Sequence, residues 1–126
     1  MTTSFRIAVI GAGETGTPLL KQLLAAPFVQ VLGVADLDLS QPGIALAREH
    51  GVPVTNNFMD LAGKGEDVDI IIDVTGAPKV RETLRQHMID SGNSHTLILH
   101  ERIALLMMSL SAGQAVSGKH TELEYH

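Results

Sequence analysis

The sequence predicts an α/β domain built on a doubly wound, mainly parallel sheet of five strands in the order 3-2-1-4-5, with helices on both faces. Two observations predict this fold class. Short apolar runs typical of buried strands alternate with helical patterns. The first such run is followed directly by a glycine-rich turn that opens a helix. With 126 residues and 44% hydrophobic content, we expect one domain over residues 1–116 and a polar tail or linker over 117–126.

The opening strand–turn–helix unit carries the most specific signal. An apolar run over 5–10 predicts a buried strand, and a helical pattern over 15–26 has its leucines on one side. Between them, Gly11, Gly13 and Gly16 form the pattern G-x-G-x-x-G. Gly11 allows a tight turn, Gly13 allows close approach to a pyrophosphate, and Gly16 lets helix and strand pack closely. The unit therefore predicts a nucleotide site.

The other residues of the glycine loop are expected to complete an anion site. Ala12, Glu14 and Thr15 occupy the variable positions of the pattern. The free N–H groups of the first helical turn face the anion, and the Thr15 hydroxyl could add a hydrogen bond. Glu14 should point to solvent, because a carboxylate facing a pyrophosphate would repel it. The alternative is a glycine-rich turn without a ligand.

A second apolar run over 30–36 predicts the next strand, and it ends in an acidic residue. Asp36 lies twenty residues after Gly16, where a carboxylate can accept hydrogen bonds from both hydroxyls of an adenosine ribose. The same charge would repel a 2′-phosphate. We therefore expect Asp36 and the adjoining Leu37 to contact NAD, with NADP less favoured. Alternatively, Asp36 only caps the following turn together with Asp38.

The middle of the chain continues the alternation. Pro42 is placed to start a helix and Gly51 to end it. Pro53 limits backbone pairing, so the short third strand over 52–54 is expected at the sheet edge. The remaining elements predicted here are a short helix capped by Asn56 or Asn57, a central strand over 68–74, and a helix from Pro78 to Asp90 that Gly92 ends.

The last strand is predicted over 95–99 and the last helix over 102–115. The main apolar stripe of this helix has the spacing i, i+3, i+4 and i+7 and consists of Ile103, Leu106, Met107 and Leu110. Further apolar residues lie off that stripe, namely Ala104, Leu105 and Met108. One sheet face cannot cover both sets. We therefore expect the 102–115 helix to contact either a second copy of the chain, as in a homodimer or other homo-oligomer, or a further domain.

Composition excludes several classes of function. The net charge of −5, from 14 acidic and 9 basic residues, argues against a nucleic-acid partner. The absence of cysteine excludes disulfides and thiol chemistry and fits a reducing cytoplasm. No signal peptide is evident and the apolar runs are too short to cross a bilayer, so we expect a cytoplasmic protein without a membrane partner.

The six histidines show no spacing typical of metal ligands, so no metal site is predicted. His100 is the only one at the carboxyl end of a predicted strand. There it either touches a ligand or faces solvent as a loop residue. No pattern of a nucleophile or of paired carboxylates stands out, and the catalytic residues stay unassigned.

From Phe5 to about Gly113 the chain resembles the NAD(P)-binding Rossmann domain of the glucose–fructose oxidoreductase and homoserine dehydrogenase families. The matching residues are the glycine loop, the strand end Val34-Ala-Asp36, and the segment from Asp69 to Pro78. The resemblance implies that the loop after the fourth strand passes beside the cofactor's ribose and nicotinamide. It thereby assigns a cofactor-binding role to Thr75, Gly76, Ala77 and Pro78.

Two departures from these families matter. In glucose–fructose oxidoreductase relatives the fifth strand ends in Glu-Lys-Pro with a catalytic lysine, whereas Arg102 stands at the corresponding position here. An arginine stays protonated and cannot easily transfer protons, so a catalytic base is not recognisable. The resemblance extends over the cofactor domain alone, so we expect the chain to act without the long C-terminal substrate domain of these families. Both departures favour a domain that binds NAD without catalysing a reaction by itself.

Less specifically, the segments 36–53 and 103–108 resemble Rossmann-like modules at the front of bacterial signalling proteins such as sensor kinases. The chain is therefore predicted to be an NAD-preferring dinucleotide-binding domain, excised from or acting within a larger oxidoreductase or signal-transduction protein. One alternative is an active NAD-dependent oxidoreductase subunit. Another is a regulatory module that binds a different nucleotide or coenzyme A.

Overall fold

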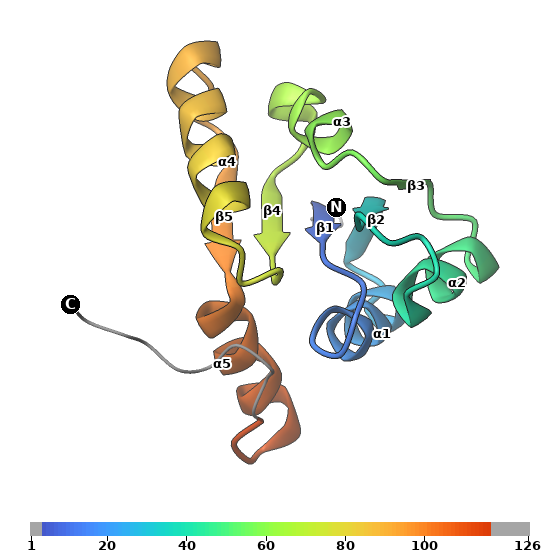
Figure 1. Cartoon of the computed structure of the whole chain (residues 1–126). Helices are drawn as coiled ribbons and strands as arrows, with labels where there is room; N and C mark the ends of the chain where they lie inside the picture. Colours follow the sequence, from blue (N-terminus) through green and yellow to red (C-terminus); the bar gives the residue numbers. More distant parts are fainter. Residues whose placement is uncertain (1–3, 117–126) are drawn as a thin grey trace.

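The computed structural model describes residues 4–116, so the predicted tail over 117–126 lies outside the described residues. Figure 1 shows the strands side by side, with helices above and below them in this view. In chain order the elements are β1 (Phe5–Ile10), α1 (Gly16–Ala25), β2 (Val29–Ala35), α2 (Pro42–Glu49), β3 (Val54–Thr55), α3 (Met59–Ala62), a 3-10 turn (Gly65–Asp67), β4 (Ile70–Asp73), α4 (Pro78–Ser91), β5 (Leu97–His100) and α5 (Glu101–Ala112).

The five strands form one sheet in the order β3-β2-β1-β4-β5, and every pairing is parallel. The predicted fold class is confirmed. The chain runs outward in one direction from β1 to β3 and then returns to the other side of β1 with β4. The connections that follow β1 and β4 therefore run toward opposite edges of the sheet, and the crevice between these two strands is the switch point where doubly wound sheets bind ligands.

Alternate residues of β1 serve two separate cores. Ile7 and Val9 join the core under α1, α2 and α5, whereas Ala8 and Ile10 join the core under α3 and α4. This division follows from the two-residue period of a strand, in which successive side chains point to opposite faces. Burial on both faces is why the strands are continuously apolar.

Some element boundaries differ from the predicted ones. The third strand is Val54–Thr55 rather than 52–54, although it lies at the sheet edge as expected. Pro53 has no N–H to donate, but its carbonyl accepts a hydrogen bond from the Val34 amide at 3.0 Å. Of the two asparagines expected to cap the next helix, Asn57 accepts a hydrogen bond from the Met59 amide at 3.1 Å.

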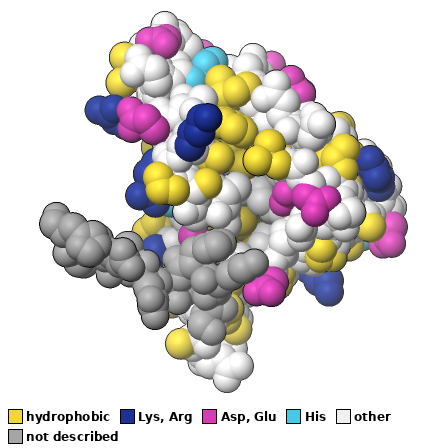
Figure 2. All heavy atoms as spheres, viewed as in Figure 1, with side chains coloured by type: hydrophobic (Ala, Val, Ile, Leu, Met, Phe, Trp, Pro, Cys, Tyr) yellow, Lys and Arg dark blue, Asp and Glu magenta, His cyan; other side chains and the backbone are white. Residues whose placement is uncertain are grey.

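The structure shows which apolar side of α5 faces the sheet. The main stripe named above is exposed, up to 74% at Leu110. The sheet is instead covered by the residues placed off that stripe, Ala104, Leu105 and Met108, together with Glu101. The small Ala104 lets the helix approach the sheet closely. In Figure 2 apolar side chains are visible on the lower end of the molecule, over α5. A partner on this face stays a prediction.

At the end of the sheet where the strands begin, Asp69 connects the starts of β1, β4 and β5. The Arg6 amide donates to Asp69 Oδ2 at 2.9 Å, and Arg6 Nη2 lies 3.0 Å from Oδ1. His95 Nε2 lies 2.8 Å from the same Oδ1. The hydrogen bonds from Arg6, with a further contribution from His95, hold the pKa of the Asp69 carboxyl well below its usual range.

Within residues 4–116, no helix is both long enough and apolar enough to cross a membrane.

We predict that Asp69→Asn lowers the free energy of unfolding at neutral pH and that this difference from the wild type shrinks in acid. A carboxyl whose pKa is lowered by folding stabilises the protein above its unfolded-state pKa of about 4, and this contribution is lost as pH falls further. Urea denaturation across a pH series measures the difference. Glu82→Gln is the control, because the exposed Glu82–Arg85 pair contributes little. A difference that is independent of pH would contradict the role of Asp69.

Candidate functional site

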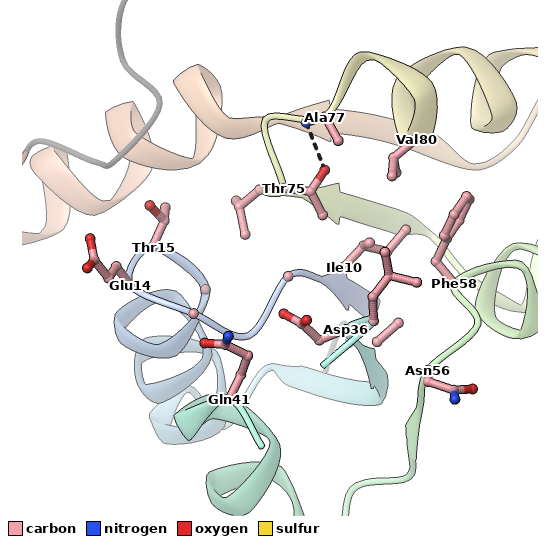
Figure 3. Close-up of a pocket in the computed structure, with 16 residues that line it drawn as sticks. Ile10, Glu14, Thr15, Asp36, Gln41, Asn56, Phe58, Thr75, Ala77 and Val80 are labelled. Carbon is pink, nitrogen blue, oxygen red and sulfur yellow. Dashed lines mark hydrogen bonds between the residues drawn. The ribbon is translucent and has the colours of Figure 1, made fainter. Parts of the chain in front are cut away.

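A pocket of about 400 Å³ opens at the carboxyl ends of the strands, beside the glycine loop (Figure 3). Its volume falls in the range of small-molecule sites. Nine of the residues predicted to bind a cofactor line it: Gly11, Gly13, Glu14, Thr15, Gly16, Asp36, Leu37, Thr75 and Ala77. Three predicted residues do not line it: Ala12, Gly76 and Pro78. Seven lining residues were not predicted: Ile10, Ala35, Gln41, Asn56, Phe58, Val74 and Val80.

The three loop glycines meet different steric constraints. Gly11 has φ +110°, and its amide donates to the Ala35 carbonyl at 2.8 Å. A Cβ at Gly16 would lie 1.9 Å from the Gly11 carbonyl oxygen, so no side chain fits there. At Gly13 a Cβ would meet only the flexible Gln41 side chain, at 3.3 Å. Folding therefore requires Gly16, whereas Gly13 leaves space that a ligand can use.

The amino terminus of α1 faces the pocket without a cap. Thr15 makes no side-chain capping bond, and the first turn of α1 holds no acidic residue. In the described part of the chain, no hydrogen bond uses the amides of Gly13, Glu14 or Thr15. Unpaired amides and the positive end of the helix dipole together favour an anion at this position.

Thr15 and Glu14 differ in exposure. Thr15 is buried, and its Oγ1 has no hydrogen-bond partner among residues 4–116. Glu14 is exposed, and in Figure 3 its carboxylate lies at the outer rim, away from Asp36 and Thr75. This placement agrees with the expectation that Glu14 points away from an anion bound to the loop.

Asp36 follows β2 directly and connects two backbone segments. The Ala12 amide donates to its Oδ2 at 2.8 Å, and the Asp38 amide donates to its Oδ1 at 2.9 Å. The carboxylate is half-buried and points into the pocket (Figure 3). Asp36 thus holds the following turn, which is the role predicted by the alternative to ribose binding. Each oxygen still has a second lone pair that can accept a hydrogen bond from a ligand hydroxyl.

The start of α2 packs on the glycine loop through a fourth glycine. The Gly43 amide donates to the Ala12 carbonyl at 2.8 Å. A Cβ at Gly43 would lie 2.8 Å from both the Cβ and the carbonyl oxygen of Ala12. Sequence reasoning missed this contact. The only local signal was a glycine directly after Pro42, in the first turn of a helix, where many residues are tolerated.

The loop after β4 is organised by Asp73, which is 3% exposed. Its Oδ1 accepts hydrogen bonds from the Thr75 amide at 3.0 Å and the Thr75 hydroxyl at 2.7 Å. The Thr75 hydroxyl in turn accepts one from the Ala77 amide at 3.2 Å (Figure 3). Gly76 has φ +65°, and this turn directs Thr75 and Ala77 into the pocket.

His100 and Glu101 lie at the end of β5, outside the pocket wall. His100 Nδ1 lies 3.1 Å from Asp73 Oδ2. Glu101 is 5% exposed, and neither carboxylate oxygen has a hydrogen-bond partner in the described region. Its position in the first turn of α5 is favoured by the helix dipole. Among residues 4–116, no group of three or more potential metal ligands gathers.

The comparisons with known sequences cover only part of larger proteins. No protein-family model matches the chain. It is similar to acetaldehyde dehydrogenase 2 of Salinispora arenicola, with 34% identity over 73 residues, or 57% of this chain and 25% of that enzyme. The acetaldehyde dehydrogenase of Chloroflexus aggregans is 33% identical over 86 residues, or 65% of this chain and 28% of the enzyme. The chain spans about a quarter of the length of these curated relatives.

Solved structures share the fold over most of the described chain. GenD2 from gentamicin A biosynthesis, solved in complex with NAD, matches 90% of this chain and 32% of its own with a TM-score of 0.60 and 23% identity. Homoserine dehydrogenase of S. aureus matches 88% of this chain and 30% of its own with a TM-score of 0.59 and 15% identity. The fold is therefore of the Rossmann type, as the sequence resemblance implies, and its structural neighbours include dehydrogenases.

We predict that alanine substitutions at two of the loop glycines differ in their effect on stability. Gly16→Ala should lower the free energy of unfolding by about 2–4 kcal/mol, because its Cβ would overlap the Gly11 carbonyl. Gly13→Ala should change it by less than about 1 kcal/mol, because only the Gln41 side chain must move. Urea denaturation of both variants tests the assignment, and equal losses of stability would contradict it.

Proposed function

We propose that this chain is an NAD-preferring dinucleotide-binding domain that supplies the cofactor part of a larger oxidoreductase. The main support is the position of the helix end beside an acidic side chain. The uncapped amino terminus of α1 opens onto the pocket beside the Asp36 carboxylate, so an anion site and an acceptor for sugar hydroxyls adjoin each other. A dinucleotide presents this pair of groups, since its pyrophosphate is next to the adenosine ribose.

The residues present fit such a ligand. The amides from Gly13 to Thr15 would hold the pyrophosphate, and the missing side chain at Gly13 leaves room for it. Asp36 would accept hydrogen bonds from the ribose hydroxyls. The apolar lining residues, such as Ile10 and Phe58, offer a surface for the adenine ring. Bound NAD would supply the hydride acceptor of an oxidation.

The charge at the pocket supports NAD over NADP. Asp36 is negative, and within residues 4–116 no lysine or arginine lines the pocket. A 2′-phosphate would therefore meet repulsion without a compensating cation.

The sequence relatives support an oxidoreductase context. The acetaldehyde dehydrogenases align with 57–65% of this chain, and the aligned part is about a quarter of each enzyme. We propose that this chain corresponds to the cofactor half of such an enzyme. On this proposal, the groups that bind the substrate and transfer its protons come from outside the domain.

We expect NADH to bind the wild-type chain more tightly than NADPH in isothermal titration calorimetry. Asp36→Ala should weaken NADH binding about tenfold or more and narrow the gap between the two cofactors, because a charged acceptor for the ribose hydroxyls is lost. Losing the Ala12 and Asp38 hydrogen bonds affects both cofactors alike, so the ratio of affinities reports what Asp36 does at the ribose, both as an acceptor for the hydroxyls and as a charge that repels a 2′-phosphate.

Asp38→Ala is the matched control for this experiment. Asp38 is exposed and does not line the pocket; its carboxylate accepts hydrogen bonds from Ser40 and from the pocket residue Gln41, so any effect is shared by both cofactors and their affinity ratio should match that of the wild type. The dinucleotide proposal fails if neither cofactor binds the wild-type chain at millimolar concentration. An unchanged affinity ratio in Asp36→Ala would refute the role of Asp36.

Gly13→Ala tests whether the glycine at this position is needed for ligand binding rather than for the turn. Its Cβ would occupy the space assigned to the pyrophosphate, so we predict at least a tenfold loss of NADH affinity in a folded protein. Calorimetry and a thermal melt of the same sample provide the two readouts. Unimpaired binding would show that the loop does not contact the phosphates.

A further inference from the structure

The strand order sets the direction in which a dinucleotide would lie across the sheet. The carboxyl ends follow one another in space as β2, β1, β4 and β5. Under the proposed function, Asp36 after β2 holds the adenosine ribose and the amides after β1 hold the pyrophosphate. The other half of the ligand therefore continues toward β4 and β5, crossing about 4.8 Å for each strand.

Two side chains meet where that half would end. Asp73 and His100 are directly paired residues of β4 and β5. His100 Nδ1 lies 3.1 Å from Asp73 Oδ2, and the other Asp73 oxygen accepts hydrogen bonds from Thr75. Because Thr75 lines the pocket, the pocket wall and His100 belong to one hydrogen-bonded network.

This network orients the imidazole of His100. The Asp73 carboxylate can only accept hydrogen bonds, so it places the proton of the neutral ring on Nδ1. Nε2 is then left as an acceptor, and no hydrogen bond among residues 4–116 uses it. The His100 side chain is 29% exposed, whereas Asp73 is 3% exposed. Part of the ring is therefore open to a ligand while its partner is enclosed.

We propose that His100 forms the nicotinamide end of the site and accepts a hydrogen bond at Nε2 from the carboxamide N–H of a bound nicotinamide dinucleotide. This inference rests on the proposed function. Asp73 acts as the positioning residue, because it determines which ring nitrogen is free. Thr75 links this end of the site to the pocket that holds the rest of the ligand.

The test compares NADH with ADP-ribose, which has the same adenosine and pyrophosphate but lacks nicotinamide. The key variant is His100→Asn, whose side-chain amide can still donate to Asp73 but has no atom at the position of Nε2. In calorimetry with the full chain, His100→Asn should weaken NADH binding about three- to tenfold and leave ADP-ribose binding unchanged. If His100 served only to pair Asp73, this variant would bind both ligands as the wild type does.

Nitrogen NMR of the histidine rings provides a second readout that does not depend on a variant binding the ligand. In the free protein, at a pH where the ring is neutral, His100 should carry its proton on Nδ1 and not on Nε2, and its signals are those that His100→Asn lacks. NADH should shift the Nε2 resonance, and ADP-ribose should leave it in place.

The outcomes are distinguishable. If the wild-type chain binds ADP-ribose and NADH but His100→Asn changes neither affinity, or lowers both equally, the inference is overturned and the proposed function stands. It is overturned in the same way if no histidine Nε2 resonance responds to NADH. If the wild-type chain binds neither ligand, the proposed function fails, and this inference fails with it.

Discussion

The close approach of α1 to the end of β1 is the constraint on which the site depends. A Cβ at Gly16 would lie 1.9 Å from the Gly11 carbonyl oxygen, so the helix can begin at this point only without a side chain. Because it begins there, its unpaired amides open onto the pocket. The neighbouring strands β2 and β4 then bring Asp36 and Thr75 to either side. The contact that joins helix and sheet thus also locates the proposed anion site.

Two aspartates hold the loops that flank this contact. Asp36 accepts hydrogen bonds from the Ala12 and Asp38 amides, and Asp73 accepts them from the Thr75 amide and hydroxyl. Both carboxylates also make other contacts. Asp36 faces the pocket, and Asp73 pairs with His100. Loops that are already ordered by such bonds lose less conformational freedom when a ligand binds. The residues that order these loops are therefore also the ones to which we assign roles in ligand binding.

The parts of the site that could be predicted are those with a local signal. The glycine spacing, the acidic strand end and the loop before Pro78 are each visible within a few neighbouring residues. Gly43, Gln41 and Phe58 were missed because their importance arises from contacts with segments far away in the chain. Gly43 is required only because α2 packs on Ala12. Nothing beside it in the sequence reports that approach.

The sequence by itself determined the alternation of strands and helices, the parallel sheet and the position of the glycine turn. These follow from short-range causes, namely apolar periodicity and the conformational freedom of glycine. Only the tertiary structure decided which face of α5 is buried, because both faces are apolar and the choice depends on how the helix fits the sheet. It also decided that Asp73 meets His100, since the register of β4 and β5 brings together residues 27 positions apart.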